Sequence, residues 1–368
     1  ADGASVSFDV LPAPQTAGFS GEMSGDSITG SFKQSGFEGT FSAPRAAPAA
    51  EATKEDKGYP EEEVTFKNGD VTLAGTLSLP VGDGPYPAIV LITGSGPQNR
   101  DEELFGFKPF AILADELTKA GVAVLRYDDR GIGGSTAGTA DDTSETFAGD
   151  VQAAMAYLQT RDDIDDAKIG LLGHSEGGII APLVAVETGE PAFLVLMAGP
   201  GIRGRELLVE QAVAVAASSG ADEATVEQTR TRQSKVLDAV LSGEGLDEIR
   251  ADLIKEVRAS AEQLPAEQKQ AFGDLDKWAE TTVDSQLEML QGAWMRFFLT
   301  HDPAETLAKV TVPVLALFGE KDAQVPPSVN VEPLKAALEK AGNKDVSVTI
   351  IPDANHLFQK AETGSPNE

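Results

Sequence analysis

Cysteine is absent from this chain of 368 residues, histidine occurs only three times, and 29 basic residues face 59 acidic ones. Without cysteine the protein has no disulfide, no thiolate metal site and no cysteine nucleophile. The net charge of −30 disfavours nucleic acid and anionic membranes as partners, because such a surface repels both. No run approaches the roughly 18 consecutive apolar residues that a membrane span needs. We therefore expect no membrane span.

The chain also lacks an initiating methionine and a signal peptide, and it starts at Ala1. A start of this kind looks processed or trimmed. It favours an exported protein, periplasmic or secreted, over a cytoplasmic one. The oligomeric state does not follow from any pattern in the sequence.

Composition divides the chain into four parts. Residues 1–41 contain short alternating runs of β-hairpin type, too few for a sheet with its own core. Residues 42–57, rich in Ala and Pro, read as a linker. In residues 58–200 and 307–368, apolar strands alternate with helical patterns, which predicts an α/β core built on a mostly parallel, doubly wound sheet. Residues 201–306 interrupt this alternation as a helical cap.

A nucleophile elbow is the most informative motif. The segment 173–178, Gly-His-Ser-Glu-Gly-Gly, follows the apolar strand 168–172 and precedes the apolar helical segment 179–186. This places Ser175 at a strand-to-helix corner, where the backbone is strained. Glycine is needed on both sides because larger side chains would collide with the neighbouring strand and helix. The pattern predicts Ser175 as the nucleophile.

A serine nucleophile needs an imidazole base, and three histidines are available. His174 is next to the serine and is expected to pack beneath the turn. His301 lies in a charged, helix-rich stretch, which favours a surface or packed residue. His356 follows the alternating strand 346–351 in a loop and is the predicted base.

The base needs a carboxylate at the carboxyl end of a neighbouring strand. The buried strand 314–318 is followed by Glu320 and Asp322. We favour Asp322 because it lies deeper in the loop, which Val325 and the proline after it can close. The predicted catalytic residues therefore occur in the order Ser, Asp, His.

An oxyanion hole requires two backbone N–H donors. Glu176, the residue after the nucleophile, supplies the first by position. The loop after strand 88–92 supplies the second, from Ser95 with Gly94 as the neighbouring candidate. This glycine-rich loop has no phosphate-binding pattern, so a nucleotide site is disfavoured.

Two further segments have alternative interpretations. The paired carboxylates of Asp128 and Asp129 could indicate a glycosidase or a metal, but the flanking arginines favour internal ion pairs that shape a turn. No histidine pair or cysteine cluster suggests catalytic zinc, so no metal site is expected. Trp294, Phe297 and Phe298 could line an acyl pocket; they could equally anchor the cap on the sheet.

From about residue 58 to its end, the chain resembles the α/β-hydrolase superfamily, and within it bacterial serine esterases of the EstD type, relatives of prolyl-oligopeptidase and serine-aminopeptidase hydrolases. The resemblance rests on residues 93–102, 126–131, 173–178 and 319–326, and on the Asn355-His356 pair. It implies the α/β-hydrolase fold, carboxylesterase activity on short acyl chains and no metal or organic cofactor. It also implies a helix after the catalytic histidine, which the last twelve residues are too short to form.

The function that we predict is therefore hydrolysis of a small-molecule ester through Ser175, His356 and Asp322. A peptidase, an amidase or a thioesterase could use the same three residues. A non-catalytic binding protein is disfavoured, because a degraded relative would be expected to have lost one of them. The natural substrate and the acyl length do not follow from the sequence.

Overall fold

The computed structural model describes residues 4–10, 17–25, 27–34, 37–44, 57–264, 269, 272, 274–365 and 368. The chain divides into two compact units. One comprises Ala1–Glu55 and Lys235–Gly292, and the other comprises Asp56–Ser234 and Ala293–Glu368. Each is described by itself.

The N-terminal segment forms a four-stranded antiparallel sheet, in the order β1 (Ala4–Val10), β2 (Ala17–Ser24), β3 (Ser27–Gln34) and β4 (Phe37–Pro44). The β-hairpin pattern is thus confirmed, and the four strands pair into one sheet. The boundary at residue 41 is wrong, because β4 continues to Pro44. Residues 45–56 of the predicted linker lie outside the described residues.

The larger unit contains an eight-stranded sheet in the order β12-β11-β10-β9-β7-β8-β6-β5, which confirms the predicted α/β class. All neighbours pair in parallel except β5 with β6 and β6 with β8. The strands are β5 (Glu61–Asn68), β6 (Val71–Ser78), β7 (Tyr86–Ile92), β8 (Ala123–Tyr127), β9 (Ile164–His174), β10 (Leu194–Met197), β11 (Val314–Gly319) and β12 (Val346–Ile351).

Strand order sets the place of the site. After β7 the chain crosses to β8, on one side, whereas after β9 it crosses to β10, on the other. Loops that leave in opposite directions open a crevice at the carboxyl ends of these strands, where ligands bind in folds of this kind.

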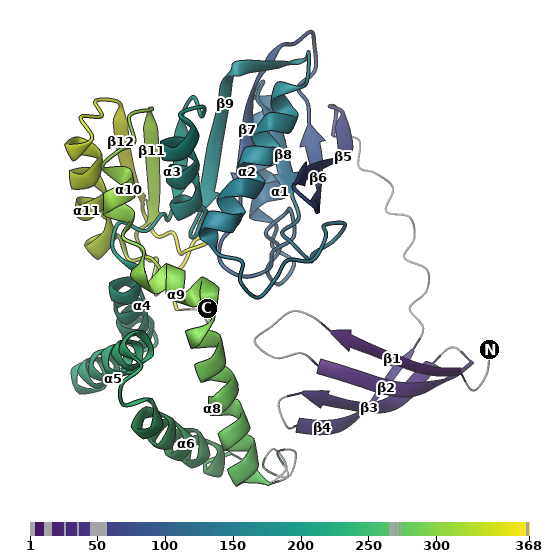
Figure 1. Cartoon of the computed structure of the whole chain (residues 1–368), viewed down its shortest axis with the longest axis vertical. Helices are drawn as coiled ribbons and strands as arrows, with labels where there is room; N and C mark the ends of the chain where they lie inside the picture. The colour runs from purple at the N-terminus through teal and green to yellow at the C-terminus, as the bar shows by residue number, and fades with distance from the viewer. Residues whose placement is uncertain are drawn as a thin grey trace. The chain divides into compact units, whose positions relative to one another are not determined.

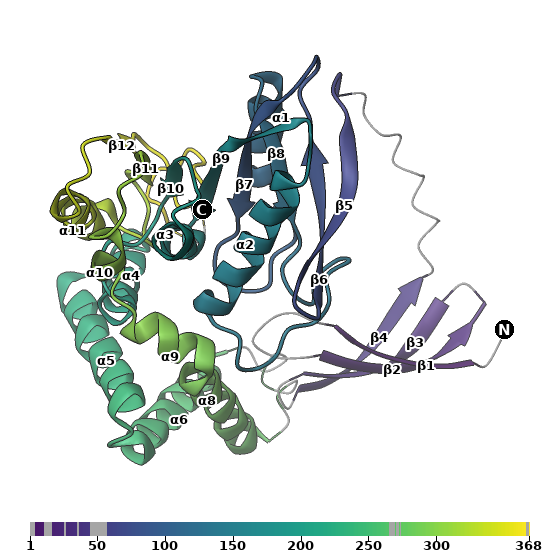
Figure 2. The same cartoon turned by 45° about the horizontal axis from the view of Figure 1, so that its top comes forward.

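Helices cover both faces of the sheet (Figures 1 and 2). Along β7, Ala88, Val90 and Ile92 pack into one core cluster and Ile89 and Leu91 into another, because successive side chains point to opposite faces. The first cluster is closed by helices α2 (Ser144–Gln159), α3 (Gly177–Thr188), α10 (Pro303–Leu307) and α11 (Pro327–Lys340), and the second by α1 (Pro109–Lys119).

The predicted helical insertion is present between β10 and β11. Its helices are α4 (Gly204–Ser218), α5 (Glu223–Ser242), α6 (Leu246–Glu262), α8 (Leu275–Gln291) and α9 (Ala293–Thr300). The insertion is not one compact piece, because α4 and α9 belong to the unit of the sheet and residues 235–292 do not. Among the described helices, none is long and apolar enough to cross a membrane.

The segment after β12 contains no helix within residues 352–365, although the resemblance implies one there. It forms turns and an isolated bridge between Ala354 and Lys360. The apolar side chains of Leu315 in β11 and Ile350 in β12 remain 37% and 46% exposed. This edge of the sheet is therefore partly open to solvent.

Candidate active site

The strand-to-helix corner has the geometry of a nucleophile elbow. Ser175 has φ = +53°, a region that L-residues seldom adopt. A Cβ atom on Gly173 would lie 1.9 Å from the carbonyl oxygen of Gly177, and one on Gly177 would lie 2.3 Å from that of Ile92. Only glycine allows β7, β9 and α3 to approach this closely. The predicted reason for the flanking glycines is confirmed.

We expect Gly173→Ala to lower the free energy of unfolding by about 3 kcal/mol or more, because the new methyl group meets rigid backbone. Urea titration measures the change. Gly149→Ala is the control, since its Cβ would meet only the flexible end of the Asn68 side chain, at 2.9 Å. That variant should stay within about 1 kcal/mol of wild type. Equal losses in the two variants would contradict this account.

The predicted acid and base are brought together by the loops after β11 and β12. His356 Nδ1 lies 2.8 Å from Asp322 Oδ2, and both side chains are buried. Asp322 Oδ1 accepts hydrogen bonds of 2.8 Å from the backbone N–H groups of Gln324 and Val325. Burial opposes ionisation of Asp322, but the charge and hydrogen bond of His356 and the two N–H donors together hold its pKa below the usual range.

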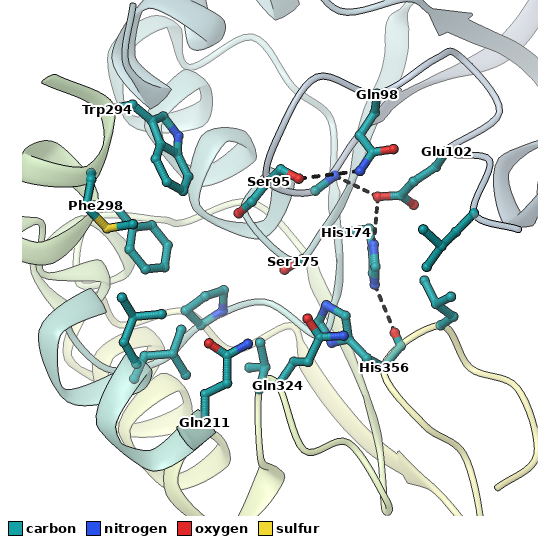
Figure 3. Close-up of a pocket in the computed structure, with 18 residues that line it drawn as sticks. Ser95, Gln98, Glu102, His174, Ser175, Gln211, Trp294, Phe298, Gln324 and His356 are labelled. Carbon is teal, nitrogen blue, oxygen red and sulfur yellow. Dashed lines mark hydrogen bonds and ion pairs between the residues drawn. The ribbon is translucent and has the colours of Figure 1, made fainter. Parts of the chain in front are cut away.

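Ser175 and His356 line the same cavity, which has a volume of about 260 Å³. Figure 3 shows the Ser175 hydroxyl at its centre, with Ser95 on one side and His356 on another. No hydrogen bond joins the Ser175 hydroxyl to the imidazole within the part of the chain that the structure describes. In hydrolases without substrate this bond is often long, and it tightens when substrate binds.

The aromatic residues of α9 divide between two faces of that helix. Trp294 and Phe298, four residues apart, line the cavity and stack with ring centroids 5.5 Å apart. The expectation that Phe297 lines it is wrong: Phe297 lies on another face of α9, and its ring stacks on His301 at 5.0 Å. The other lining residues are Gly94, Ser95, Gln98, Glu102, Leu104, His174, Pro200, Leu207, Leu208, Gln211, Met295, Gln324, Val325 and Leu357.

The two candidates in the loop after β7 are not equivalent. The backbone N–H of Gly94 donates a 2.7 Å hydrogen bond to Glu102 Oε1 and is therefore occupied. Ser95 is exposed and faces the cavity. It remains as the candidate oxyanion donor from this loop, opposite Glu176.

Glu176 has a second feature that the sequence did not reveal. Its side chain is buried, and Oε1 accepts hydrogen bonds from Ser144 Oγ at 2.6 Å and Trp294 Nε1 at 2.7 Å. Burial raises the pKa of this carboxyl, and the hydrogen bonds from Ser144, Trp294 and Ser95 oppose the rise. Glu176 thereby connects the elbow to α2 and α9.

Among the described residues, neither of the other two histidines has a hydrogen bond to the predicted acid. His174 is buried beneath the turn, as expected, and bonds to Glu102 and to the backbone of His356. His301 is half-buried, and burial lowers its pKa. It does not line the cavity.

Comparison with known proteins agrees with the fold. Residues 89–363 match the model of the alpha/beta hydrolase family. The chain belongs to this family. It is 26% identical over 320 residues to esterase EstD of Thermotoga maritima, an alignment that covers 85% of this chain and 65% of that esterase. The resemblance to this type of protein is thus confirmed.

Two solved structures are similar to this chain at lower sequence identity. The proline iminopeptidase of Mycobacterium smegmatis is 19% identical and has a TM-score of 0.50, with 80% of this chain and 92% of that chain covered. The esterase Pf2001 of Pyrococcus furiosus is 17% identical and has a TM-score of 0.49, with 83% and 85% covered.

Within this alpha/beta hydrolase, the arginines around the paired carboxylates shape the loops, but not by the expected pairs. Asp128 pairs with Arg100 of the loop after β7, at 2.7 Å. Arg126 pairs with Asp101 and Glu61, and Arg130 with Asp142 and Asp150. The partners thus come from other segments. Among the described residues, no group of three or more carboxylates and histidines could hold a metal ion.

Asp129 differs sharply from its neighbour Asp128. Burial raises the pKa of Asp129 to about 8, and the charges of Glu176 and Glu102 add to the rise. Hydrogen bonds from the N–H of Gln98 and from Thr93 Oγ1 oppose it. Burial opposes ionisation of Asp128, but its ion pair with Arg100 outweighs burial and lowers the pKa of Asp128. Burial therefore favours the neutral form of the Asp129 carboxyl, whereas the ion pair with Arg100 favours the charged form of Asp128.

This difference predicts how stability depends on pH. Between pH 4 and 8 the unfolded chain releases the Asp129 proton and the folded chain keeps it, so the contribution of this residue to stability falls by up to about 1.4 kcal/mol per pH unit. Asn imitates the neutral acid, so we expect Asp129→Asn to gain stability over wild type as pH rises through this window. Urea unfolding at several pH values measures it. A constant difference between the two proteins would contradict the prediction.

Proposed function

We propose that this protein is a serine carboxylesterase that hydrolyses short-chain acyl esters. Membership of the alpha/beta hydrolase family supports hydrolase activity, and the similarity to an esterase supports an ester substrate. One observation carries the proposal: Ser175 on a strained elbow shares a cavity with His356, whose other ring nitrogen is held by Asp322.

The residues would act in two steps. Ser175 Oγ attacks the ester carbonyl carbon while His356 Nε2 takes its proton, and Asp322 stabilises the resulting imidazolium through Nδ1–H. The N–H groups of Ser95 and Glu176 stabilise the oxyanion. His356 then gives the proton to the leaving alcohol. Water, deprotonated by His356, attacks the acyl-enzyme carbonyl carbon, and His356 returns that proton to Ser175 Oγ as the bond to the serine breaks and the acid leaves.

The cavity supports a small and uncharged substrate. Its volume of about 260 Å³ and its walls of Trp294, Phe298 and Leu208 suit a short acyl chain. No arginine or lysine lines it among the described residues, and the net charge of the chain is −30. A carboxylate or phosphate on the substrate would therefore meet repulsion, because His174, which also lines the cavity, is already paired with Glu102.

A series of p-nitrophenyl esters from acetate to laurate tests this function. We expect the highest kcat/KM with the shortest acyl chains and a decline once the chain outgrows the cavity. Matched p-nitroanilides should turn over more slowly. Absence of turnover on every ester, or a preference for anilides, would overturn the proposal.

A further inference from the structure

His174 lies between two loops that the proposed reaction needs. One is the oxyanion loop, residues 93–102 after β7; the other is the histidine loop, residues 352–360 after β12. His174 Nδ1 lies 2.8 Å from Glu102 Oε1, and its Nε2 lies 2.9 Å from the carbonyl oxygen of His356. Both bonds are buried, and Figure 3 shows them joining Glu102, His174 and His356 in succession.

The hydrogen-bond partners of His174 constrain which of its ring nitrogens carry protons. The carbonyl oxygen of His356 only accepts, so Nε2 must donate to it. Glu102 Oε1 already accepts the N–H of Gly94 at 2.7 Å and, as a carboxylate, also accepts from Nδ1. A neutral imidazole has one N–H and could supply only one of these donors. With Glu102 as a carboxylate, which can only accept, both ring nitrogens of His174 donate, and the arrangement is that of an imidazolium.

The surroundings supply the compensating charge. Glu102 is buried, and its second oxygen, Oε2, has no hydrogen-bond partner among the described residues, so His174 and Gly94 compensate this carboxylate through Oε1. Burial disfavours the imidazolium, but the charge and hydrogen bond of Glu102 outweigh it and raise the pKa of His174. A buried charge pair of this kind is strongly coupled, because either partner alone would be left uncompensated.

We propose that His174 and Glu102 are positioning residues that hold the oxyanion loop and the histidine loop in place relative to Ser175. This inference rests on the proposed function. Glu102 occupies the Gly94 N–H, which leaves the next N–H, that of Ser95, to face the substrate. His174 holds the backbone of His356, and the two rings lie with centroids 4.7 Å apart, tilted by 44°.

The hydrogen bonds of His174 to Glu102 and to the backbone of His356 form a bridge between the two loops. This bridge holds the loops at the site, where neither has regular secondary structure. Both are irregular, and Glu102 itself has φ = +50°. Loss of the bridge would let both loops shift relative to Ser175, and a displacement of about 1 Å costs about 100-fold in rate. Substrate binding depends mainly on the apolar walls of the cavity, so the loss should appear in kcat.

The test compares two isosteric substitutions of buried, ion-paired carboxylates. Glu102→Gln removes the charge of the bridge. Asp150→Asn does the same to a carboxylate outside the site, which binds Arg130 and Asn68. With p-nitrophenyl acetate we expect Glu102→Gln to lose about 10- to 100-fold in kcat with KM within about threefold. Asp150→Asn should keep kcat within about threefold of wild type, although we expect both substitutions to lower the melting temperature.

His174→Gln is the second variant, in case Glu102→Gln does not fold, and the same loss in kcat is expected. If the folded variants keep kcat within threefold of wild type, or if Asp150→Asn loses as much as they do, the bridge is refuted. A wild-type protein without turnover would instead refute the proposed function.

A spectroscopic measurement tests the bridge whatever the turnover. The chain has only three histidines, so ¹⁵N-labelled imidazoles can be assigned from the His174→Gln spectrum. We expect His174 to carry N–H protons on both ring nitrogens at neutral pH, and to lose one in Glu102→Gln. A His174 with a single ring proton in the wild type would overturn the inference.

Discussion

Ser175→Ala should lose at least about 10⁴-fold in kcat on p-nitrophenyl acetate, because no other group can form the acyl-enzyme at this elbow. Alanine keeps the Cβ atom and therefore the backbone strain of φ = +53°. The Ser175 hydroxyl donates no hydrogen bond in the described part of the chain, so its loss should change the free energy of unfolding by less than about 1 kcal/mol. Steady-state kinetics and urea titration measure the two effects.

The remaining rate is itself informative. The oxyanion donors and the cavity survive in Ser175→Ala, so a small acceleration over water is expected to persist. A variant that keeps more than a tenth of the wild-type kcat would contradict the role of Ser175. Contaminating esterase from the expression host is controlled by purifying the variant and the wild type in parallel.

Asp322→Asn should lose about 10⁴-fold in kcat, because the substitution moves the ring proton of His356 to the wrong nitrogen. The amide oxygen of the introduced side chain can still accept the N–H groups of Gln324 and Val325, so its NH₂ group faces His356 Nδ1. That arrangement favours a lone pair on Nδ1 and places the ring proton on Nε2. An imidazole protonated on Nε2 cannot take the proton of Ser175.

Glu320→Gln is the matched control for Asp322→Asn. Glu320 lies in the same loop and was the alternative acid in the sequence, but its Oε2 accepts the backbone N–H of Asp353 at 3.0 Å and does not reach His356. We expect kcat within about threefold of wild type, the range of a substitution outside the site. If Glu320→Gln lost activity and Asp322→Asn kept it, the assignment of the acid would be wrong.

The same pair makes a prediction for acid stability. The pKa of Asp322 is lower in the folded than in the unfolded chain, so the stabilisation is present above the unfolded value and is lost as pH falls through the folded value. Urea unfolding should therefore show that the advantage of wild type over Asp322→Asn shrinks at acidic pH. An advantage that grew on acidification would contradict the ion pair.

Local signals made much of the site predictable. The elbow is contained within six residues, and the need for glycine there follows from steric contact alone. His356 and Asp322 could be paired because each follows a buried strand, and the carboxyl ends of parallel strands meet at one edge. The structure confirms that the side chains of this pair are in contact.

What the sequence did not reveal depends on contacts between distant segments. Glu102 lies 72 residues before His174, and no sequence pattern in either segment predicts the hydrogen bond between them. Glu102 also accepts the N–H of Gly94, which could not be separated from Ser95 by spacing. Helical spacing does not separate Phe297 from the cavity residues, because it is three residues from Trp294; its contact with His301 does.

Active-site labelling tests the central claim most directly. A fluorophosphonate probe should attach to Ser175 alone, as located by peptide mass spectrometry, and the rate of labelling should fall in both Asp322→Asn and His356→Asn while Glu320→Gln reacts like wild type. Labelling at another serine, or ester hydrolysis that continues after Ser175 is fully blocked, would contradict the account.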